Sequence, residues 1–199
     1  MSQTRDETIL WESFLNGDNH SLEVIYRIYF DELYRYGMKW LKDGHLVEDV
    51  IQDLFVRLIQ SRGNLAVAQS VKFYLFRAFK NMALDKIRFA KRMVAGNEPS
   101  SDTFQLDLTP ESTMIDKEEY LIIKSKIENA LVQLTPRQRE ALYLRYIEEF
   151  SYSEVSEMMG LTAKGTYKLM SRAIEAIRGQ LPAGIFIFLS NHFLRLHPY

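Results

Sequence analysis

The chain of 199 residues contains no cysteine and only four histidines. Without thiols it can form neither disulfides nor thiolate metal sites, which suits a reducing cytoplasm. The histidines lack metal-ligand spacing and a nucleophile partner, and no glycine-rich phosphate loop is present. We therefore expect no metal, no cofactor and no catalytic residue, and an enzyme with a small-molecule substrate is disfavoured.

Long apolar runs are also missing. No segment reaches the roughly 18 to 20 apolar residues that a membrane span needs, and the N-terminus has no apolar signal core. Hydrophobic residues nevertheless make up 47% of the chain, which is enough for one or two small domains with cores. We predict a folded, soluble and cytoplasmic protein.

Strand signals are scarce, because period-two alternation is confined to very short runs. Apolar residues recur at helical spacing instead, so we predict an all-α fold of two small helical domains. The expected helices cover residues 7–15, 22–41, 47–60, 71–93 and 117–132, followed by three more. Prolines, polar residues and acidic charge between residues 96 and 110 predict a flexible acidic linker. The predicted parts are a domain 1–95, a linker 96–115, a domain 116–180 and an apolar tail 181–199.

The net charge of −1 hides a strong segregation of charge along the chain. Residues 1–70 and 96–136 carry net charges of −4 and −5, whereas residues 71–95 and 137–199 carry +6 and +2. Two basic segments are thus separated by an acidic one. This layout predicts two separate contacts with a polyanion, while the acidic parts face solvent or a protein partner.

The C-terminal part has the pattern of a helix-turn-helix. Two capping boxes, Thr135 with Gln138 and Ser151 with Glu154, mark the starts of two short helices. Gly160 then allows a tight stop, and Thr162 can cap the helix that follows. An ordinary helical hairpin is the plainer interpretation of the same signals.

The helix after Gly160 has two distinct faces. An apolar face is formed by Thr166, Met170, Ala173 and Ile177. In a helix-turn-helix the second helix enters the major groove, so its other face predicts contacts with duplex DNA. Those candidates are Lys164, Tyr167, Lys168, Ser171 and Arg172.

The predicted helix 47–60 is amphipathic. Its apolar stripe consists of Val47, Ile51, Leu54 and Leu58. Four acceptor groups cluster on the other face within two turns: Glu48, Asp49, Gln52 and Asp53. Taken alone, this face is more typical of a solvated surface than of a binding site.

The predicted helix 71–93 interleaves aromatic and basic residues, a mixture that suits single-stranded nucleic acid. Bases stack on aromatic rings while Lys and Arg follow the phosphates. Spacing by three places Phe73, Phe76 and Phe79 mostly in the core instead, which leaves the base-rich face as the candidate. The expected contacts are Arg77, Lys80, Asn81, Lys86 and Arg88.

These motifs together resemble the bacterial RNA polymerase sigma factors of the extracytoplasmic-function (ECF) type. Residues 47–55, VEDVIQDLF, resemble region 2.2 of that family, and residues 77–88, RAFKNMALDKIR, resemble regions 2.3 and 2.4. The C-terminal helix-turn-helix resembles region 4. The resemblance covers about residues 21–178, and the linker 96–110 stands where other sigma factors have region 3.

The resemblance implies a promoter-recognition protein whose partners are core RNA polymerase and promoter DNA. The acidic face around Asp49 is expected to dock on the clamp helices of the largest polymerase subunit. The basic face around Asn81 is expected to hold the opened −10 element, with Asn81 lining a pocket for a flipped base that the loop 61–70 helps to select. The helix with Arg172 is expected to read the −35 element. Catalysis belongs to the polymerase, and an anti-sigma protein, often membrane-bound in this family, is the expected regulator.

Three positions depart from the commonest family pattern: Gly165, Thr166 and Leu169. The promoter sequence is therefore not implied. The apolar run 185–189 is expected to cover the C-terminal domain rather than meet a partner. A plain helix-turn-helix regulator remains the main alternative, although it would need neither the Asp49 motif nor the Asn81 motif.

Overall fold

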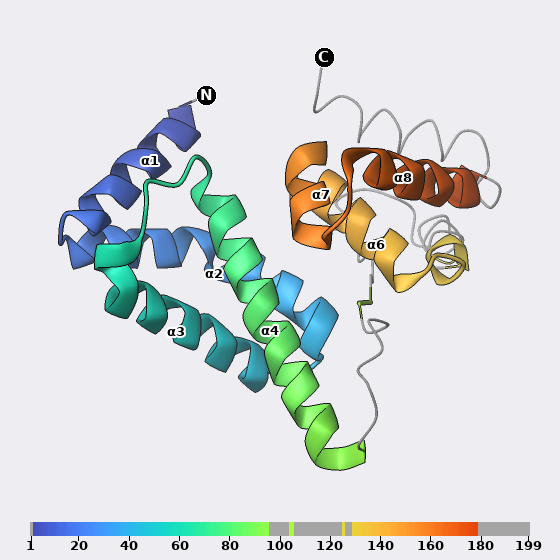
Figure 1. The fold of residues 1–199 in the computed structure, drawn as a ribbon, viewed down its shortest axis with the longest axis horizontal. Helices are drawn as coiled ribbons and strands as arrows, with labels where there is room; N and C mark the ends of the chain where they lie inside the picture. Colours follow the sequence, from blue (N-terminus) through green and yellow to red (C-terminus); the bar gives the residue numbers. More distant parts are fainter. Residues whose placement is uncertain (1, 96–103, 106–124, 126–128, 179–199) are drawn as a thin grey trace, which may run out of the picture. The chain divides into compact units, whose positions relative to one another are not determined.

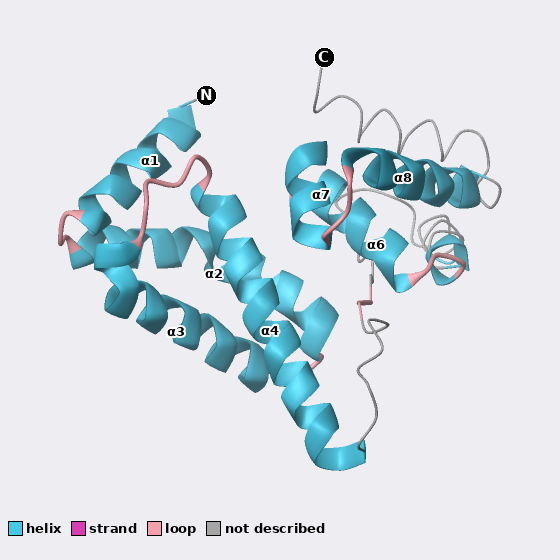
Figure 2. Ribbon diagram, in the orientation of Figure 1, coloured by secondary structure: helices cyan, strands magenta, loops and turns pink. Residues whose placement is uncertain are grey.

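The computed structural model describes residues 2–95, 104–105, 125 and 129–178. The chain divides into two compact units, residues 1–103 and 104–199, and each is described here by itself. Within the described ranges every regular element is helical and no strand occurs (Figure 1, Figure 2). The predicted all-α fold is confirmed. No helix among these residues has the length and apolar character needed to cross a bilayer.

Within residues 2–95, the described part of the N-terminal unit, there are four α-helices and one short 3-10 helix. They are α1 (Ser2–Leu15), α2 (Asn19–Leu41), α3 (Gly44–Ser61), η1 (Arg62–Asn64) and α4 (Val71–Ala95). The four predicted helices are all present. The first three begin a few residues earlier than predicted, and the starts of α2 and α3 are fixed by aspartate caps.

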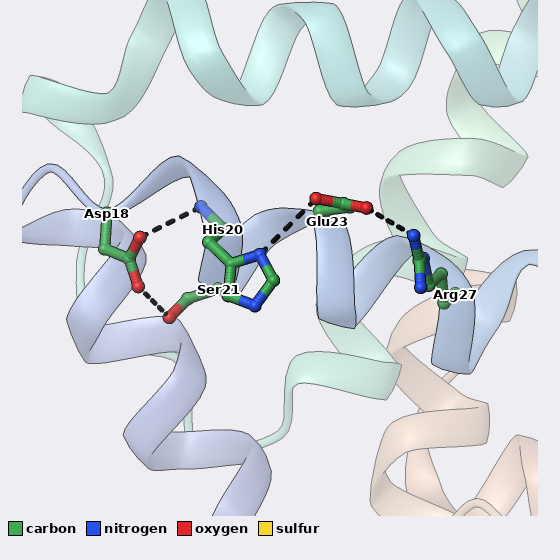
Figure 3. Close-up of polar contacts among 5 residues, drawn as sticks. All are labelled: Asp18, His20, Ser21, Glu23 and Arg27. Carbon is green, nitrogen blue, oxygen red and sulfur yellow. Dashed lines mark hydrogen bonds and ion pairs between the residues drawn. The ribbon is translucent and has the colours of Figure 1, made fainter.

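Asp18 caps α2 through both carboxylate oxygens (Figure 3). One oxygen accepts from the His20 backbone N–H at 2.9 Å and the other from the Ser21 hydroxyl at 2.6 Å. The Ser21 hydroxyl, followed by the His20 amide, holds the pKa of Asp18 below its ordinary value. On the next turn, Glu23 pairs with His20 and Arg27, so the first two turns of α2 are tied together.

The core of this unit is rich in aromatic rings. Helix α2 contacts α1, α3 and α4, and Figure 1 shows α4 crossing it. The largest fully buried side chains here are Trp11, Phe14, Ile25, Leu33, Tyr36, Ile51, Leu54, Leu75, Phe76 and Phe79. Three helices meet most closely at Gly37 of α2, where a Cβ atom would lie 2.6 Å from Val47 Cγ1 and 2.7 Å from Phe79 Cζ.

Between residues 136 and 178, the described part of the C-terminal unit has three α-helices and a π-helical turn. They are α6 (Pro136–Leu142), the π turn η2 (Tyr143–Ile147), α7 (Tyr152–Met159) and α8 (Ala163–Arg178). The three helices match the prediction, whereas the π turn had no sequence signal. Of the helix predicted over residues 117–132, residues 125 and 129–132 are described and are helical, and the rest lies outside the described residues.

One residue of the predicted linker packs against the C-terminal unit. Phe104 is 1% exposed, and its ring meets Tyr143 edge-on at a centroid distance of 5.6 Å. The anchored residue belongs to the unit that begins at Phe104. Apart from Phe104 and Gln105, the residues 96–115 and the tail 181–199 lie outside the described part of the chain.

We predict that Gly37→Ala destabilises the N-terminal unit. The added methyl would press on Val47 and Phe79, which are both fully buried, so the cost is about 1–3 kcal/mol, offset by up to about 1 kcal/mol of helix propensity. Urea unfolding followed by tryptophan fluorescence measures this unit alone, because both tryptophans, Trp11 and Trp40, lie in it.

Gly63→Ala is the matched control, since nothing lies within 4 Å of the added Cβ. Its unfolding midpoint should stay at the wild-type value. A Gly37→Ala protein as stable as wild type would contradict the close approach of the three helices.

Candidate functional sites

The predicted acidic face lies on the outside of α3. The apolar stripe Val47, Ile51, Leu54 and Leu58 is 0–2% exposed, as predicted. On the opposite side Asp49, Gln52 and Asp53 are exposed, and Glu48 is half-buried. The helix therefore presents its carboxylates while its apolar stripe holds it on the core.

Two apolar residues that the sequence analysis did not single out share the outer side of α3. Val56 is 50% exposed and Ile59 is 48% exposed. Val56 is one turn after Gln52, so it extends the acidic face toward the end of the helix. The signal was present in the sequence, because both residues lie off the buried stripe.

The exposed face of α4 combines Arg77, Asn81 and Arg88. These residues are four and seven positions apart, which places them on one side of a helix with about 3.6 residues per turn, and all three are exposed. Asp85 lies on the same side and pairs with Arg88, with an Oδ1 to Nη1 distance of 3.2 Å. The structure thus brings together two cations and one amide of the predicted set.

The expectation that Lys80 lies on this exposed face is wrong. Lys80 is 7% exposed, and its ammonium nitrogen lies 5.5 Å from the centre of the Trp40 ring. A cation over an indole face is attracted by the negative charge of the ring, so this lysine is directed toward the end of α2. The position of Lys80 next to Asn81 in the sequence did not indicate this burial.

Lys86 also lies apart from the Arg77 face. Nine residues correspond to two and a half turns, so Lys86 points to the other side of α4 from Arg77. Its Nζ atom is 3.3 Å from Asp53 Oδ2 of α3, and both side chains are about half exposed. An expected DNA contact is therefore paired with an expected polymerase contact.

The loop between α3 and α4, residues 61–70, is held against α1 and α2. The Trp11 indole N–H donates to the Ala66 carbonyl at 3.1 Å. The Arg62 guanidinium donates to the Asn19 side chain and stacks over Phe14 at 4.7 Å. At the end of the loop, Ser70 Oγ accepts from the Phe73 backbone N–H and so caps α4. The loop is fixed beside the first turns of α4, and its predicted part in base selection stays a prediction.

The predicted caps of the helix-turn-helix are confirmed. Both capping boxes are complete, Thr135 with Gln138 and Ser151 with Glu154. Gly160 adopts the left-handed conformation with φ of 61°, which ends α7 and turns the chain sharply. The hydroxyl oxygen of Thr162 accepts from the Gly165 backbone N–H at 3.1 Å and so starts α8.

Helix α8 shows the two faces that the sequence predicted. Of the predicted apolar face, Thr166, Met170 and Ala173 are at most 1% exposed and Ile177 is half-buried. All five predicted contact residues are exposed on the other side: Lys164, Tyr167, Lys168, Ser171 and Arg172. The structure therefore collects the whole predicted set on one face of one helix.

A pair of buried hydroxyls joins α7 to α8. Ser156 Oγ and Thr166 Oγ1 are 2.8 Å apart. Ser156 Oγ also lies 2.7 Å from the Tyr152 carbonyl oxygen in α7, and Thr166 Oγ1 lies 3.2 Å from the carbonyl oxygen of Thr162, the residue before α8. Thr166 is fully buried. Here its hydroxyl fixes the two helices of the turn to one another.

One ring on the exposed face of α8 is held by a neighbouring ring. Tyr167 stacks on Tyr152 of α7, with centroids 4.5 Å apart and an interplanar angle of 18°. The Arg145 guanidinium lies over Tyr152 at 5.1 Å. Burial, together with a hydrogen bond to Tyr152, raises the pKa of Tyr146 to about 12. The sequence analysis missed Tyr152 and Arg145, because only the fold brings them next to α8.

Two family models match the chain, one over each part of this arrangement. The model "Sigma-70 region 2" matches residues 25–93, and "Sigma-70, region 4" matches residues 124–177. Together they include α3, α4, α7 and α8. The ECF RNA polymerase sigma factor SigM of Bacillus subtilis is 26% identical, over 83% of this chain and 98% of its own length. SigW of the same organism is also 26% identical, over 83% of this chain and 91% of its own. The chain belongs to the ECF-type RNA polymerase sigma factors.

Solved structures support the fold. CnrH, solved in complex with the cytosolic domain of CnrY, is 19% identical with a TM-score of 0.57, covering 87% of this chain and 95% of its own. The sigma factor RpoE of Bartonella quintana, solved with the anti-sigma factor NepR, is 17% identical with a TM-score of 0.55, covering 80% and 95%.

We predict that removing either buried hydroxyl weakens the contact between α7 and α8. Ser156→Ala and Thr166→Val should each cost about 1 kcal/mol, because each leaves the other hydroxyl without its partner across the turn. The double variant should cost less than the sum of the two, since no unmatched hydroxyl then faces the other helix. Hydrogen exchange of the α7 and α8 amides measures this, and strictly additive costs would show that the hydroxyls act independently.

Proposed function

We propose that this sigma factor contacts core RNA polymerase and promoter DNA through three faces, one each on α3, α4 and α8. The observation that carries the proposal is the separation of surface chemistry among these helices. Acidic and apolar residues are exposed on α3, basic residues and the Asn81 amide are exposed on α4, and basic residues with Tyr167 and Ser171 are exposed on α8. Each face lies within a region that matches a sigma-70 model.

The outer face of α3 is the proposed polymerase-binding surface. Its carboxylates at Asp49 and Asp53 suit a basic partner, and the half-exposed Val56 and Ile59 supply apolar area that a charged patch alone lacks. Glu48 is half-buried and stands at the edge of this surface, while Gln52 is exposed beside Val56. We propose the clamp helices of the largest polymerase subunit as the partner.

The Arg77 face of α4 is the proposed surface for the opened −10 element. Arg77 and Arg88 supply positive charge to either side of Asn81, whose amide can both donate to and accept from a base edge. An unpaired base turned out of the strand exposes such an edge. Lys80 is left out of this surface because it is buried, and Lys86 is left out because it lies on the other side of α4, paired with Asp53 of α3.

The exposed face of α8 is the proposed reader of the −35 element in the major groove. Lys164, Lys168 and Arg172 provide positive charge for phosphates and bases. Tyr167 provides an aromatic ring and Ser171 a hydroxyl group. In this proposal the α8 face binds duplex DNA and the α4 face binds single-stranded DNA. Two DNA contacts agree with two basic segments that lie far apart in the sequence.

The alternative, a helix-turn-helix regulator that acts without polymerase, accounts only for the C-terminal unit. It does not account for the match of residues 25–93 to the region 2 model. Sigma factors as a class are initiation factors and leave catalysis to the polymerase. We further propose that the chain works in the cytoplasm, where its polymerase is, and that an anti-sigma protein regulates it. The solved relatives CnrH and RpoE were each captured in a complex, RpoE with an anti-sigma factor.

We predict that Asp49→Arg abolishes co-migration of the chain with bacterial core RNA polymerase on a sizing column. Reversal of an exposed charge at the centre of a complementary interface costs binding energy while leaving the fold intact. Asp31→Arg, which reverses an exposed charge on α2, is the matched control and should still co-migrate. If wild type binds duplex DNA alone and never core polymerase, the proposal fails in favour of a simple regulator.

We predict that Asn81→Ala spares polymerase binding and −35 binding but reduces open-complex formation at least tenfold. Loss of the amide removes hydrogen bonds that are made only to an unpaired base, so the closed complex should be unaffected. Permanganate reactivity of thymines in the melted region measures the effect. Asn129→Ala, an exposed amide in the other unit, should melt promoters normally. Normal melting by Asn81→Ala would remove the residue from the proposed surface.

A further inference from the structure

Three side chains, Arg145, Tyr152 and Tyr167, stack on one another beside α8. Arg145 comes from the π turn η2, Tyr152 from the first turn of α7, and Tyr167 from the second turn of α8. Arg145 Nη1 also donates to the Phe150 carbonyl at 2.9 Å, which holds the guanidinium over Tyr152. Three elements thus converge to set the position of one ring on the proposed DNA-reading face.

The Tyr167 ring is held in place by Tyr152 and remains accessible to solvent. Its ring lies 4.5 Å from that of Tyr152, and the residue is still 57% exposed. Both rings line each of two hollows, of about 590 and 450 Å³, so the stacked pair forms the ridge between them. A large apolar group fixed in an exposed position loses little rotamer entropy when it binds a partner.

The chemistry of the major groove limits what such a ring can recognise. Every base pair offers hydrogen-bond acceptors there, so the Tyr167 hydroxyl discriminates poorly among them. The C5-methyl of thymine is the one apolar group that the four bases present in this groove. An immobilised aromatic ring in the groove is therefore complementary to thymine and to no other base.

We infer that Tyr167 reads a thymine methyl in the −35 element and that Tyr152 and Arg145 are positioning residues that hold its ring. The inference rests on the proposed role of α8 in duplex recognition and adds to it the base that one residue selects. The charged residues of the same face supply attraction to DNA, whereas Tyr167 supplies a preference that does not depend on charge.

The test uses the full chain bound to core RNA polymerase. Promoter duplexes are first selected from random DNA by this holoenzyme, and each thymine of the −35 element is then replaced singly by deoxyuridine, which lacks only the methyl. Wild type should lose about fourfold in affinity at one position, the amount expected for one buried methyl group. Tyr167→Ala should bind the thymine and deoxyuridine duplexes equally at that position.

Matched variants separate positioning from folding and from general attraction. Tyr152→Phe keeps the stacked ring and should keep the thymine preference, whereas Tyr152→Leu and Arg145→Leu should reduce it. Arg172→Ala should weaken binding to both duplexes by the same factor and leave the preference unchanged. Binding of each variant to core polymerase and the hydrogen exchange of α8 show that the unit is folded.

The outcomes are distinct. Equal binding of the two duplexes by wild type at every −35 position would overturn the inference while leaving the role of α8 intact. A thymine preference that survives in Tyr167→Ala would assign the methyl contact to another residue and also overturn it. A holoenzyme that selects no duplex at all would instead overturn the proposed function.

Discussion

The N-terminal unit depends on the close approach of three helices at Gly37. Val47 of α3 and Phe79 of α4 both reach the space that a side chain at this position would occupy. Helices held this near leave no room for rotation, because interiors are packed to the density of organic crystals. The outward direction of Asp49 and of Asn81 follows from that packing, since each lies two residues from one of the two contacting side chains. The proposed binding surfaces on α3 and on α4 are thus both oriented by one internal contact.

In the C-terminal unit, a different set of contacts orients the exposed face of α8. Its helices are short, and short helices in isolation are marginal in water. Two capping boxes, the left-handed Gly160 and the Ser156–Thr166 hydroxyl pair fix their ends and their crossing. These hydrogen bonds add to an apolar core that includes Leu144, Val155 and Ala173. The face of α8 is exposed because the opposite face, with Thr166, Met170 and Ala173, is buried within the unit.

Local signals explain what the sequence could predict. Caps depend on residues three positions apart, and amphipathic faces depend on helical period, so both boxes, the α3 stripe and the two faces of α8 were accessible without coordinates. Lys80 was misplaced because its partner, Trp40, belongs to another helix. The position of Lys86 opposite Arg77 follows from the helical period and was overlooked. The π turn had no signal, and the contact of Tyr152 with Tyr167 exists only once α7 is folded against α8. Predictions from sequence thus succeeded mostly where the cause lies within one element, and those for Lys80 and Tyr152 failed because the cause lies between two.

The pairing of Lys86 with Asp53 has a consequence for how two partners share this unit. The two groups are about half exposed, and an exposed ion pair contributes only about 0–1 kcal/mol. A partner that takes either charge therefore displaces the other at little cost. Under the proposed roles, a basic partner that engages Asp53 frees Lys86, and the acidic face of α3 is not neutralised by the neighbouring helix. A pair this weak leaves both charges accessible, while the packing of Val47 and Phe79 at Gly37 holds α3 and α4 in place.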